Sequence, residues 1–266
     1  KRQINILQAL GKEPPQYAHV PMILGDDGAR LSKRHGAVSV MEYRKQGILP
    51  EALLNYLVRL GWSHGDREIF PVDDMIELFD IADVNRAASA FNTDKLLWLN
   101  QHYIKNDDPA RIARLLSPHM GDLDVDPSVD PPLVDVVVAQ QERAQSLVEM
   151  ARISTFFYQD FEEYDEPAAR KHLRPVAREP LLQMRSALES LGDWRPEALH
   201  QAVVDVAGAL DMKMGKVAQP LRVAVVGRAA SPGIDVTLHL VGREACLRRI
   251  DRALEFIQKR MDESAS

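Results

Sequence analysis

A short basic segment near the start of the chain carries residue types that could act on a polyphosphate. Residues 30–36 are Arg-Leu-Ser-Lys-Arg-His-Gly, so three charged side chains, a histidine and a hydroxyl stand within seven positions. A phosphate group in transfer needs positive charge close to its oxygens. Lys33 is the best single candidate, because a compact ammonium can follow the charge as it develops. Ser32 can donate a hydrogen bond, and Arg30 and Arg34 could contact phosphate or nucleic acid.

The elements around this segment predict an exposed loop. Residues 17–24 are mostly apolar but contain Pro21, which is typical of a strand at an edge or near a site. Residues 25–28, Gly-Asp-Asp-Gly, have turn composition. A loop that closes after the nucleotide binds could then deliver Lys33. By composition alone, a short basic run is more often only a solvated loop.

The rest of the chain is predicted to be helical. Proline or a capping residue begins most of the apolar segments with a helical period, and glycine ends several of them. The acidic, proline-containing residues 121–132 indicate a loop. The predicted helices cover about 1–10, 50–60, 109–117, 133–150, 152–160, 167–172, 175–191, 196–211, 215–227, 232–241 and 243–261, with two more that Asp73 and Asn92 or Thr93 cap.

Composition bounds the class of protein. The chain has 266 residues, 45% of them hydrophobic, and a single cysteine, which excludes an internal disulfide and a cysteine-cluster metal site. With no signal peptide at the start, we expect a cytoplasmic protein. The net charge of −6 is uneven: residues 1–50 carry +4, 51–134 carry −8, 135–170 carry −5 and 171–266 carry +3. Basic ends permit nucleic acid to bind there but do not demonstrate it.

Longer motifs extend well beyond the basic segment. They are His19-Val20-Pro21, Leu31-Ser32-Lys33-Arg34-His35-Gly36, Leu49-Pro50-Glu51-Ala52-Leu53-Leu54-Asn55-Tyr56-Leu57, Leu60-Gly61-Trp62-Ser63, Phe91-Asn92, Trp98-Leu99-Asn100 and Lys213 to Arg222. Together these motifs resemble bacterial glutamyl-tRNA synthetase, a class I aminoacyl-tRNA synthetase. The resemblance covers essentially the whole chain and is weakest at about 120–175.

The resemblance implies an ATP site. The family's KMSKS loop corresponds here to residues 30–34, with Arg30 in place of the usual first lysine, and Lys33 matches the lysine that acts on ATP. Met22 and Ile23 match the strand beside the adenine. ATP with Mg²⁺ is the expected substrate complex, and we expect no metal held by this chain. The family's other signature, HIGH, is not in this sequence. We therefore expect the C-terminal portion of the enzyme, unable alone to form glutamyl-adenylate.

The implied fold class is mainly α. Residues 1–38 would be the remnant of a Rossmann-like catalytic domain, and residues 39–108 an α-rich stem-contact domain. Residues 109–170 and 171–266 would form two subdomains of an all-helical anticodon-binding region.

Cationic residues in the rear half are candidates for contact with the anticodon, because arginine and lysine bind RNA phosphates and base edges. Arg222 stands in an otherwise apolar run, where a buried structural ion pair is the competing interpretation. The anticodon candidates are Arg222, Arg228, Lys213 and Lys216. The arginines of the last helix are instead predicted to form an ordinary solvated face; they are Arg243, Arg248, Arg249 and Arg252.

Three other residues, Trp62, Trp98 and Cys246, are predicted to lie in the core.

Alternative functions remain open at this point. The first hypothesis is part of a glutamate–tRNA ligase, a monomer that acts on ATP, L-glutamate and tRNA(Glu), with tRNA(Gln) as a further candidate. The second is a non-catalytic tRNA-binding module, and the third is a helical protein-interaction scaffold. A glutaminyl-tRNA synthetase is rejected, because its anticodon region is expected to be a β-barrel and residues 110–266 are predicted to be helical.

Overall fold

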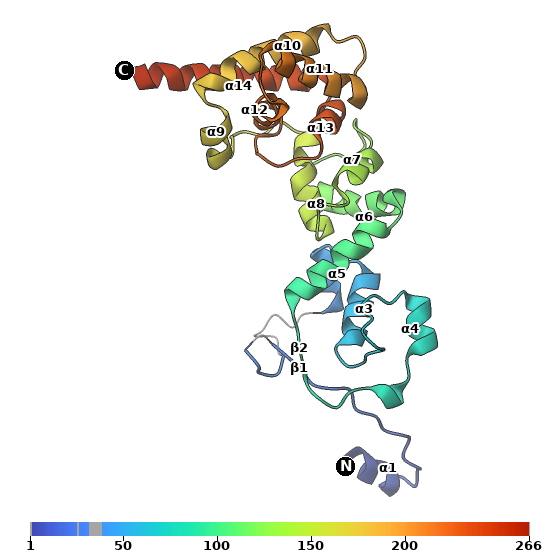
Figure 1. The fold of residues 1–266 in the computed structure, drawn as a ribbon. Coiled ribbons are helices and arrows are strands. Elements are labelled where there is room, and N and C mark those ends of the chain that lie inside the picture. The colour runs from blue at the N-terminus through green and yellow to red at the C-terminus, as the bar shows by residue number, and fades with distance from the viewer. Residues whose placement is uncertain (1, 26, 32–38, 266) are drawn as a thin grey trace. The chain divides into compact units, whose positions relative to one another are not determined.

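The computed structural model describes residues 2–25, 27–31 and 39–265, which fall into two compact units, residues 1–103 and 104–266. The described residues are mostly helical, as Figure 1 shows, so the mainly α fold class is confirmed. Within these residues the strands are short and lie in the first unit. We call residues 30–36 the basic loop, after the loop predicted there from the sequence. Its residues Ser32, Lys33, Arg34 and His35 lie outside the described residues.

The first unit combines short helices with one parallel pair of strands. Ile23 pairs with Ser89 and Leu24 with Ala90 in this two-stranded sheet. The predicted strand over 17–24 is therefore confined to its last two residues. In chain order the elements of the unit are α1 (Arg2–Ala9), β1 (Ile23–Leu24), α2 (Val40–Lys45), α3 (Pro50–Arg59), α4 (Val72–Leu78), the 3-10 helix η2 (Ile81–Asp83), β2 (Ser89–Ala90) and most of α5 (Thr93–Asn106).

Two buried asparagines fix α3 and α5 in this unit. Asn55 Oδ1 accepts hydrogen bonds from the backbone N–H of Phe70 (2.8 Å) and from the Tyr103 hydroxyl (2.9 Å). Asn100 Oδ1 accepts one from the N–H of Leu49 (2.8 Å), directly before α3. Both asparagines are fully buried. Because an unpaired buried amide is costly, these bonds specify one register of the loops against the helices.

The two tryptophans of the first unit have different environments. Trp62 is 1% exposed and its ring packs edge-to-face on Phe70 (centroids 5.2 Å apart), so its predicted core position is confirmed. Trp98 is 47% exposed, and its predicted core position is wrong. The buried face of α5 carries Leu96 and Leu99. Trp98 follows Leu96 by two residues, about 200° around the helix, and so points away from that face.

The second unit is a set of packed helices. Helices α10, α11, α12 and α14 pack on one another around its largest apolar cluster, and α6, α7 and α8 pack together. In Figure 1 these elements run from green to red. Their bounds are α6 (Pro109–Gly121), α7 (Leu133–Gln140), α8 (Leu147–Ser154), η3 (Thr155–Phe157), α9 (Glu166–His172), η4 (Pro175–Ala177), α10 (Arg178–Ser190), α11 (Pro196–Ala209), α12 (Met214–Val226), α13 (Ile234–Val241) and α14 (Arg243–Ala265).

The long helix predicted over 133–150 is wrong, because the chain breaks between α7 and α8. Polar side chains stabilise this break. Gln141 Nε2 donates to the carbonyls of Ile104 and Asp107 (both 2.8 Å), and Ser146 accepts from the N–H of Glu149 as the N-cap of α8. Local side-chain bonds of this type offer the backbone an alternative to a continuous helix.

Helices α12, α13 and α14 contribute many buried apolar side chains to the core of the second unit. Cys246 on α14 is fully buried, which confirms its predicted packing role, and burial raises the pKa of its thiol to about 12. Helix α12 ends at Gly227, whose φ of +81° is the left-handed conformation that favours glycine.

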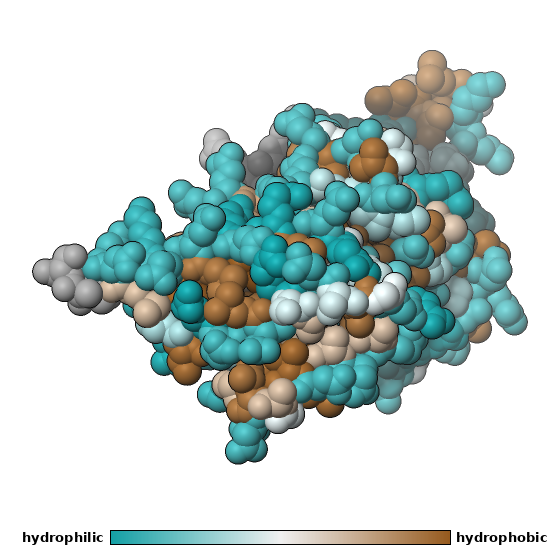
Figure 2. Space-filling model, turned by 90° about the horizontal axis from the view of Figure 1, so that it is seen from above, coloured by the Kyte–Doolittle hydropathy of each residue, from teal (hydrophilic) through white to brown (hydrophobic). Residues whose placement is uncertain are grey.

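On the face shown in Figure 2, hydrophilic side chains predominate and hydrophobic patches lie between them. No helix of the described residues has both the length and the apolar character needed to span a membrane.

Candidate functional site

The segment that leads into the basic loop is held by backbone hydrogen bonds on both edges of β1. The carbonyls of Met22 and Leu24 accept from the N–H groups of Ser89 (3.0 Å) and Phe91 (2.8 Å). On the other edge, the Ile23 carbonyl accepts from the N–H of Leu31 (2.9 Å). The N–H of Gly25 also donates to the Ala29 carbonyl (2.8 Å), so residues 29–31 lie alongside β1.

The structure places three of the predicted ATP residues on this segment. The Met22 side chain is half exposed and Ile23 is partly buried, so an apolar surface remains available beside the strand. Arg30 is exposed and forms a bridge to Leu24. The other predicted ATP residues, Lys33, Ser32 and Arg34, lie outside the described residues.

Arg222 in α12 binds the turn that precedes α13. Its guanidinium Nη1 donates to the carbonyls of Ser231 (2.9 Å) and Pro232 (2.6 Å), and to the Ser231 hydroxyl. Burial, with the nearby charge of Arg143, lowers the pKa of Arg222. Arg222 therefore donates hydrogen bonds to backbone carbonyls. Among the described residues it does not pair with a buried carboxylate, as a structural ion pair would require.

The turn that Arg222 holds forms one wall of a cavity of about 590 Å³. Apolar side chains of α7 and α13 contribute much of the surface, and Arg143 and His239 add groups that can donate hydrogen bonds. The carboxylates of Asp135 and Glu142 line the same cavity and can accept hydrogen bonds, so its surface combines apolar side chains with both donors and acceptors. The residues that line it are Asp135, Val138, Ala139, Glu142, Arg143, Pro232, Gly233, Val236, His239 and Leu240.

Arg228 follows the end of α12. Its guanidinium lies 5.7 Å from the centre of the Phe156 ring, and Nη2 donates to the Arg152 carbonyl (3.4 Å). Burial, together with the charge of Arg152, lowers the pKa of Arg228. Arg228 follows α12 by two residues, and its side chain is only partly buried, so it still contacts solvent.

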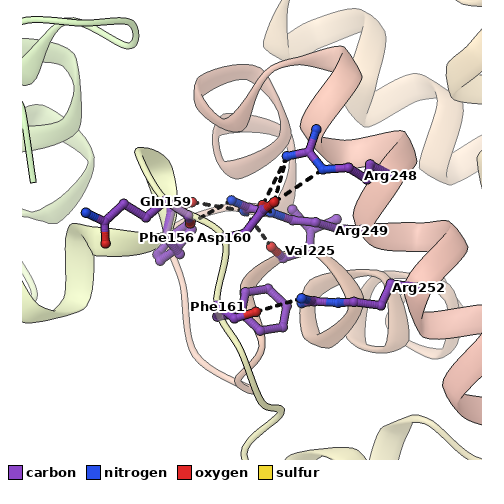
Figure 3. Close-up of polar contacts among 8 residues, drawn as sticks. All are labelled: Phe156, Gln159, Asp160, Phe161, Val225, Arg248, Arg249 and Arg252. Carbon is purple, nitrogen blue, oxygen red and sulfur yellow. Dashed lines mark hydrogen bonds and ion pairs between the residues drawn. The ribbon is translucent and has the colours of Figure 1, made fainter.

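The arginines of α14 do not form the ordinary solvated face that the sequence predicts. Arg248 and Arg249 both donate to the carboxylate of Asp160, with Arg249 Nε 2.8 Å from Oδ1 (Figure 3). Arg249 is 3% exposed. Arg252 lies over the Phe161 ring, 4.0 Å from its centre, and donates to the Phe161 carbonyl (2.6 Å). We call Asp160, Arg248, Arg249 and their bonds the Asp160 clasp; it ties α14 to the segment after η3.

The pH dependence of stability should reveal the Asp160 clasp. Burial tends to raise the pKa of Asp160, but hydrogen bonds from Arg249 and Arg248 lower it below its usual range. The clasp therefore stabilises the fold fully above the ordinary carboxyl pKa of about 3.9, and this contribution disappears as the pH falls through the lower folded-state value.

We expect Asp160→Asn to lower the urea midpoint by a constant amount between pH 7 and about pH 5, and by progressively less below about pH 4. Urea titrations of both proteins across this range measure the difference. A difference as large at about pH 3 as at pH 7 would show that the carboxylate charge does not stabilise the clasp.

Gly227 permits the close passage of two segments at the end of α12. Its carbonyl accepts from the N–H of Asp165 (2.8 Å), and a Cβ at this position would lie 2.8 Å from the Phe161 ring. Strain at positive φ and this contact should make Gly227→Ala lower the free energy of unfolding by about 1–3 kcal/mol. Gly208→Ala is the matched control, because Gly208 lies in α11 with no atom near its added Cβ. Chemical denaturation should show the control unchanged or slightly more stable; equal losses would contradict the prediction.

Lys213 and Lys216, the remaining predicted contacts, are exposed at the start of α12 and line a cavity of about 710 Å³. The opposite side of this cavity carries three residues that the sequence analysis missed: Lys171, His172 and Arg174. The basic run over 171–174 was the available signal. Only the fold brings that run beside residues some forty positions later.

The described residues contain no group of three or more His, Cys, Asp or Glu side chains that could hold a metal ion.

Two family models match the chain. Residues 111–254 match the model described as "Anticodon binding domain", and residues 1–98 match "tRNA synthetases class I (E and Q), catalytic domain". The chain belongs to the anticodon binding domain family of the tRNA synthetases. It corresponds to the C-terminal portion of bacterial glutamate–tRNA ligases, so the resemblance stated from the sequence is confirmed.

Two individual relatives are glutamate–tRNA ligases. The chain is 59% identical to glutamate–tRNA ligase 1 of Alkalilimnicola ehrlichii over 258 residues, and 60% identical to that of Nitrosococcus oceani over 259 residues; each match covers 97% of this chain and 55% of the relative. The chain therefore spans about half the length of these relatives.

Solved structures show the same relationship. A glutamate–tRNA ligase from Elizabethkingia meningosepticum, in complex with its amino acid, superposes with a TM-score of 0.83 at 28% identity, covering 96% of this chain and 54% of that one. The glutamate–tRNA synthetase of Elizabethkingia anophelis gives a TM-score of 0.80, also at 28% identity and with the same coverage. Arg222, Arg228, Lys213 and Lys216 all lie within the anticodon binding domain match, and the basic loop lies within the catalytic domain match.

Proposed function

We propose that this chain is the part of a glutamate–tRNA ligase that supplies the ATP loop and recognises the anticodon arm of tRNA(Glu). The observation that carries the proposal is the union of the two matches in one chain: a catalytic-domain segment with a lysine-containing loop, followed by a helical anticodon binding domain. The ligase would act as a cytoplasmic monomer, with Mg²⁺ accompanying ATP and tRNA(Gln) as a further candidate substrate.

The reaction has two steps. The carboxylate of glutamate attacks the α-phosphorus of ATP and releases pyrophosphate, and a terminal ribose hydroxyl of the tRNA then attacks the mixed anhydride. In the first step Lys33 would stabilise negative charge on the phosphates, while Arg30, Ser32 and Arg34 add donors around them. The exposed Met22 side chain and Ile23 offer the apolar surface for adenine.

Recognition of the anticodon is proposed for the second unit. Arg222 holds the turn over 231–232 at the wall of the 590 Å³ cavity, and Arg143 also lines this cavity. An anticodon base that leaves the loop stack could enter this cavity and meet apolar walls and hydrogen-bond donors. Arg228, Lys213 and Lys216 would contribute positive charge for the phosphates.

Binding of tRNA by the chain tests the proposal. Labelled tRNA(Glu) should bind with a Kd that weakens steeply as salt rises, because each phosphate contact releases counterions. A transcript with altered anticodon bases and an unchanged stem should bind about 10-fold to 100-fold more weakly, which corresponds to one or two lost base contacts. Equal affinity for both transcripts would contradict recognition of the anticodon.

A further inference from the structure

The cavity of about 710 Å³ beside the start of α12 is built from two segments distant in sequence. One side is the end of α9 and η4, and the other is the turn after α11 with the first half of α12. The residues that line it are Lys171, His172, Arg174, Val176, Ala177, Asp211, Met212, Lys213, Gly215, Lys216, Gln219 and Pro220.

The charge of this cavity is strongly positive. Four lysine or arginine side chains and one histidine line it against a single carboxylate, that of Asp211. Within the part of the chain that the structure describes, none of these four cations forms an ion pair. In contrast, Arg248 and Arg249 of the same unit share the carboxylate of Asp160. Like charges gathered without internal partners create a local field that attracts an anion.

The electrostatic state of His172 agrees with this field. Burial lowers the pKa of His172, and the charges of Lys171, Arg174 and Lys216 lower it further. Lys213 and Asp211 are the other charged groups around the same cavity. An anion placed among these cations would offset their repulsion and raise the pKa of His172.

The cavity also offers contacts that a simple anion would not use. The Val176 side chain is 65% exposed, and Met212 and Pro220 add apolar surface around the cations. Among the described residues, Gln219 Oε1 is buried without a hydrogen-bond partner and lines the same space. A buried amide oxygen with no partner is costly, so rotation of the Gln219 side chain toward the cavity, where Oε1 could accept from an N–H donor on a ligand, would be favourable. Phosphate, apolar surface and an amino donor together are the features of a nucleotide.

We infer that this cavity binds one nucleotide unit of the anticodon arm, with its phosphate among Arg174, Lys213 and Lys216 and its base amino group on Gln219 Oε1. The inference rests on the proposed function and deepens it. It adds a subsite on α9 and η4 to the contacts expected from α12. The lining residues then have two different roles. The cations bind the phosphate whatever the base sequence, and Gln219 distinguishes one base from another.

Substitution of a cation tests the phosphate contact. We expect Arg174→Gln to weaken binding of the labelled anticodon arm of tRNA(Glu) to the full chain about 3-fold to 10-fold, equally for all loop sequences, and to reduce the slope of log Kd against log salt by about 1. Arg170→Gln is the matched control, because Arg170 is exposed on α9, four residues before Arg174, but does not line the cavity. Equal losses for both variants, or no loss for Arg174→Gln, would overturn the phosphate site.

Gln219→Leu tests the base contact. This variant should lower affinity for the native loop about fivefold and reduce discrimination against loops with single base changes. Unchanged discrimination would overturn the role of Gln219, including when overall affinity falls. Circular dichroism of each variant shows whether the helices remain folded. Failure of the wild-type chain to bind any anticodon arm would refute the proposed function together with this inference, whereas normal wild-type binding with indifferent variants would refute the inference alone.

The titration of His172 reports on the position of the RNA directly. NMR of histidine-labelled protein, with His172→Asn used for assignment, should show that the pKa of His172 rises when the anticodon arm binds. Arg170→Gln should show the same rise, and Arg174→Gln a smaller one. RNA binding that leaves the pKa of His172 unchanged would place the phosphate elsewhere.

Discussion

Replacement of Arg249 by methionine is expected to lower the free energy of unfolding by about 3–5 kcal/mol, because it leaves a set of buried acceptors without their donor. The Arg249 guanidinium binds four groups from three segments. Nη1 donates to the carbonyls of Phe156 and Val225 (both 2.9 Å). Nη2 donates to Gln159 O, and Nε to Asp160 (both 2.8 Å). Methionine retains most of the apolar stem but none of these bonds.

Arg248→Met is the control for this prediction. Arg248 binds the same carboxylate of Asp160, but its side chain is 59% exposed, and exposed ion pairs contribute about 0–1 kcal/mol. Urea titrations of the full chain measure both variants, and hydrogen exchange of α12 and α14 localises the effect. Equal and small losses would show that burial of Arg249 does not set the strength of the clasp.

Lys33→Ala is expected to slow formation of glutamyl-adenylate about a hundredfold, with the affinity for tRNA unchanged. The expectation depends on the proposed role of Lys33 in stabilising charge that develops on the phosphates. Loss of one such transition-state contact costs about 3 kcal/mol. The tRNA arm is bound by other residues, so its Kd should stay within about twofold of the wild-type value.

A full-length ligase that contains this sequence is the protein in which to measure this effect. ATP–pyrophosphate exchange gives the rate of adenylation, and filter binding gives the Kd for tRNA. Lys12→Ala is the control, because Lys12 is an exposed lysine outside the basic loop. Parallel losses of exchange and of tRNA affinity in Lys33→Ala would show a general structural role.

Local sequence signals predicted most of the helical fold. Prolines at first-turn positions and glycines after helices placed the ends of several rear helices within about two residues, as for α11 and α12. The errors arose where tertiary contacts decide. The break at 141–146 depends on Gln141 binding carbonyls more than thirty residues away. The exposure of Trp98 depends on which face of α5 meets the rest of its unit.

The candidate site was predictable only in part, for a related reason. Motif spacing identified the residues of the basic loop and of α12. The charge pattern of α14, with acids between arginines, is typical of a solvated helix. It gave no sign that Asp160, some ninety positions earlier, would bury Arg249. The cationic cavity likewise joins residues 171–174 to residues 211–220, which no local pattern connects.

A hydroxyl-radical footprint of tRNA(Glu) bound to this chain tests the proposed recognition of the anticodon arm by the second unit. We predict protection of the backbone around the anticodon loop, which Arg174→Gln reduces at one nucleotide and Arg170→Gln leaves intact. Protection confined to the opposite arm of the L-shaped tRNA, or no protection at concentrations where binding is complete, would show that the second unit does not recognise the anticodon arm.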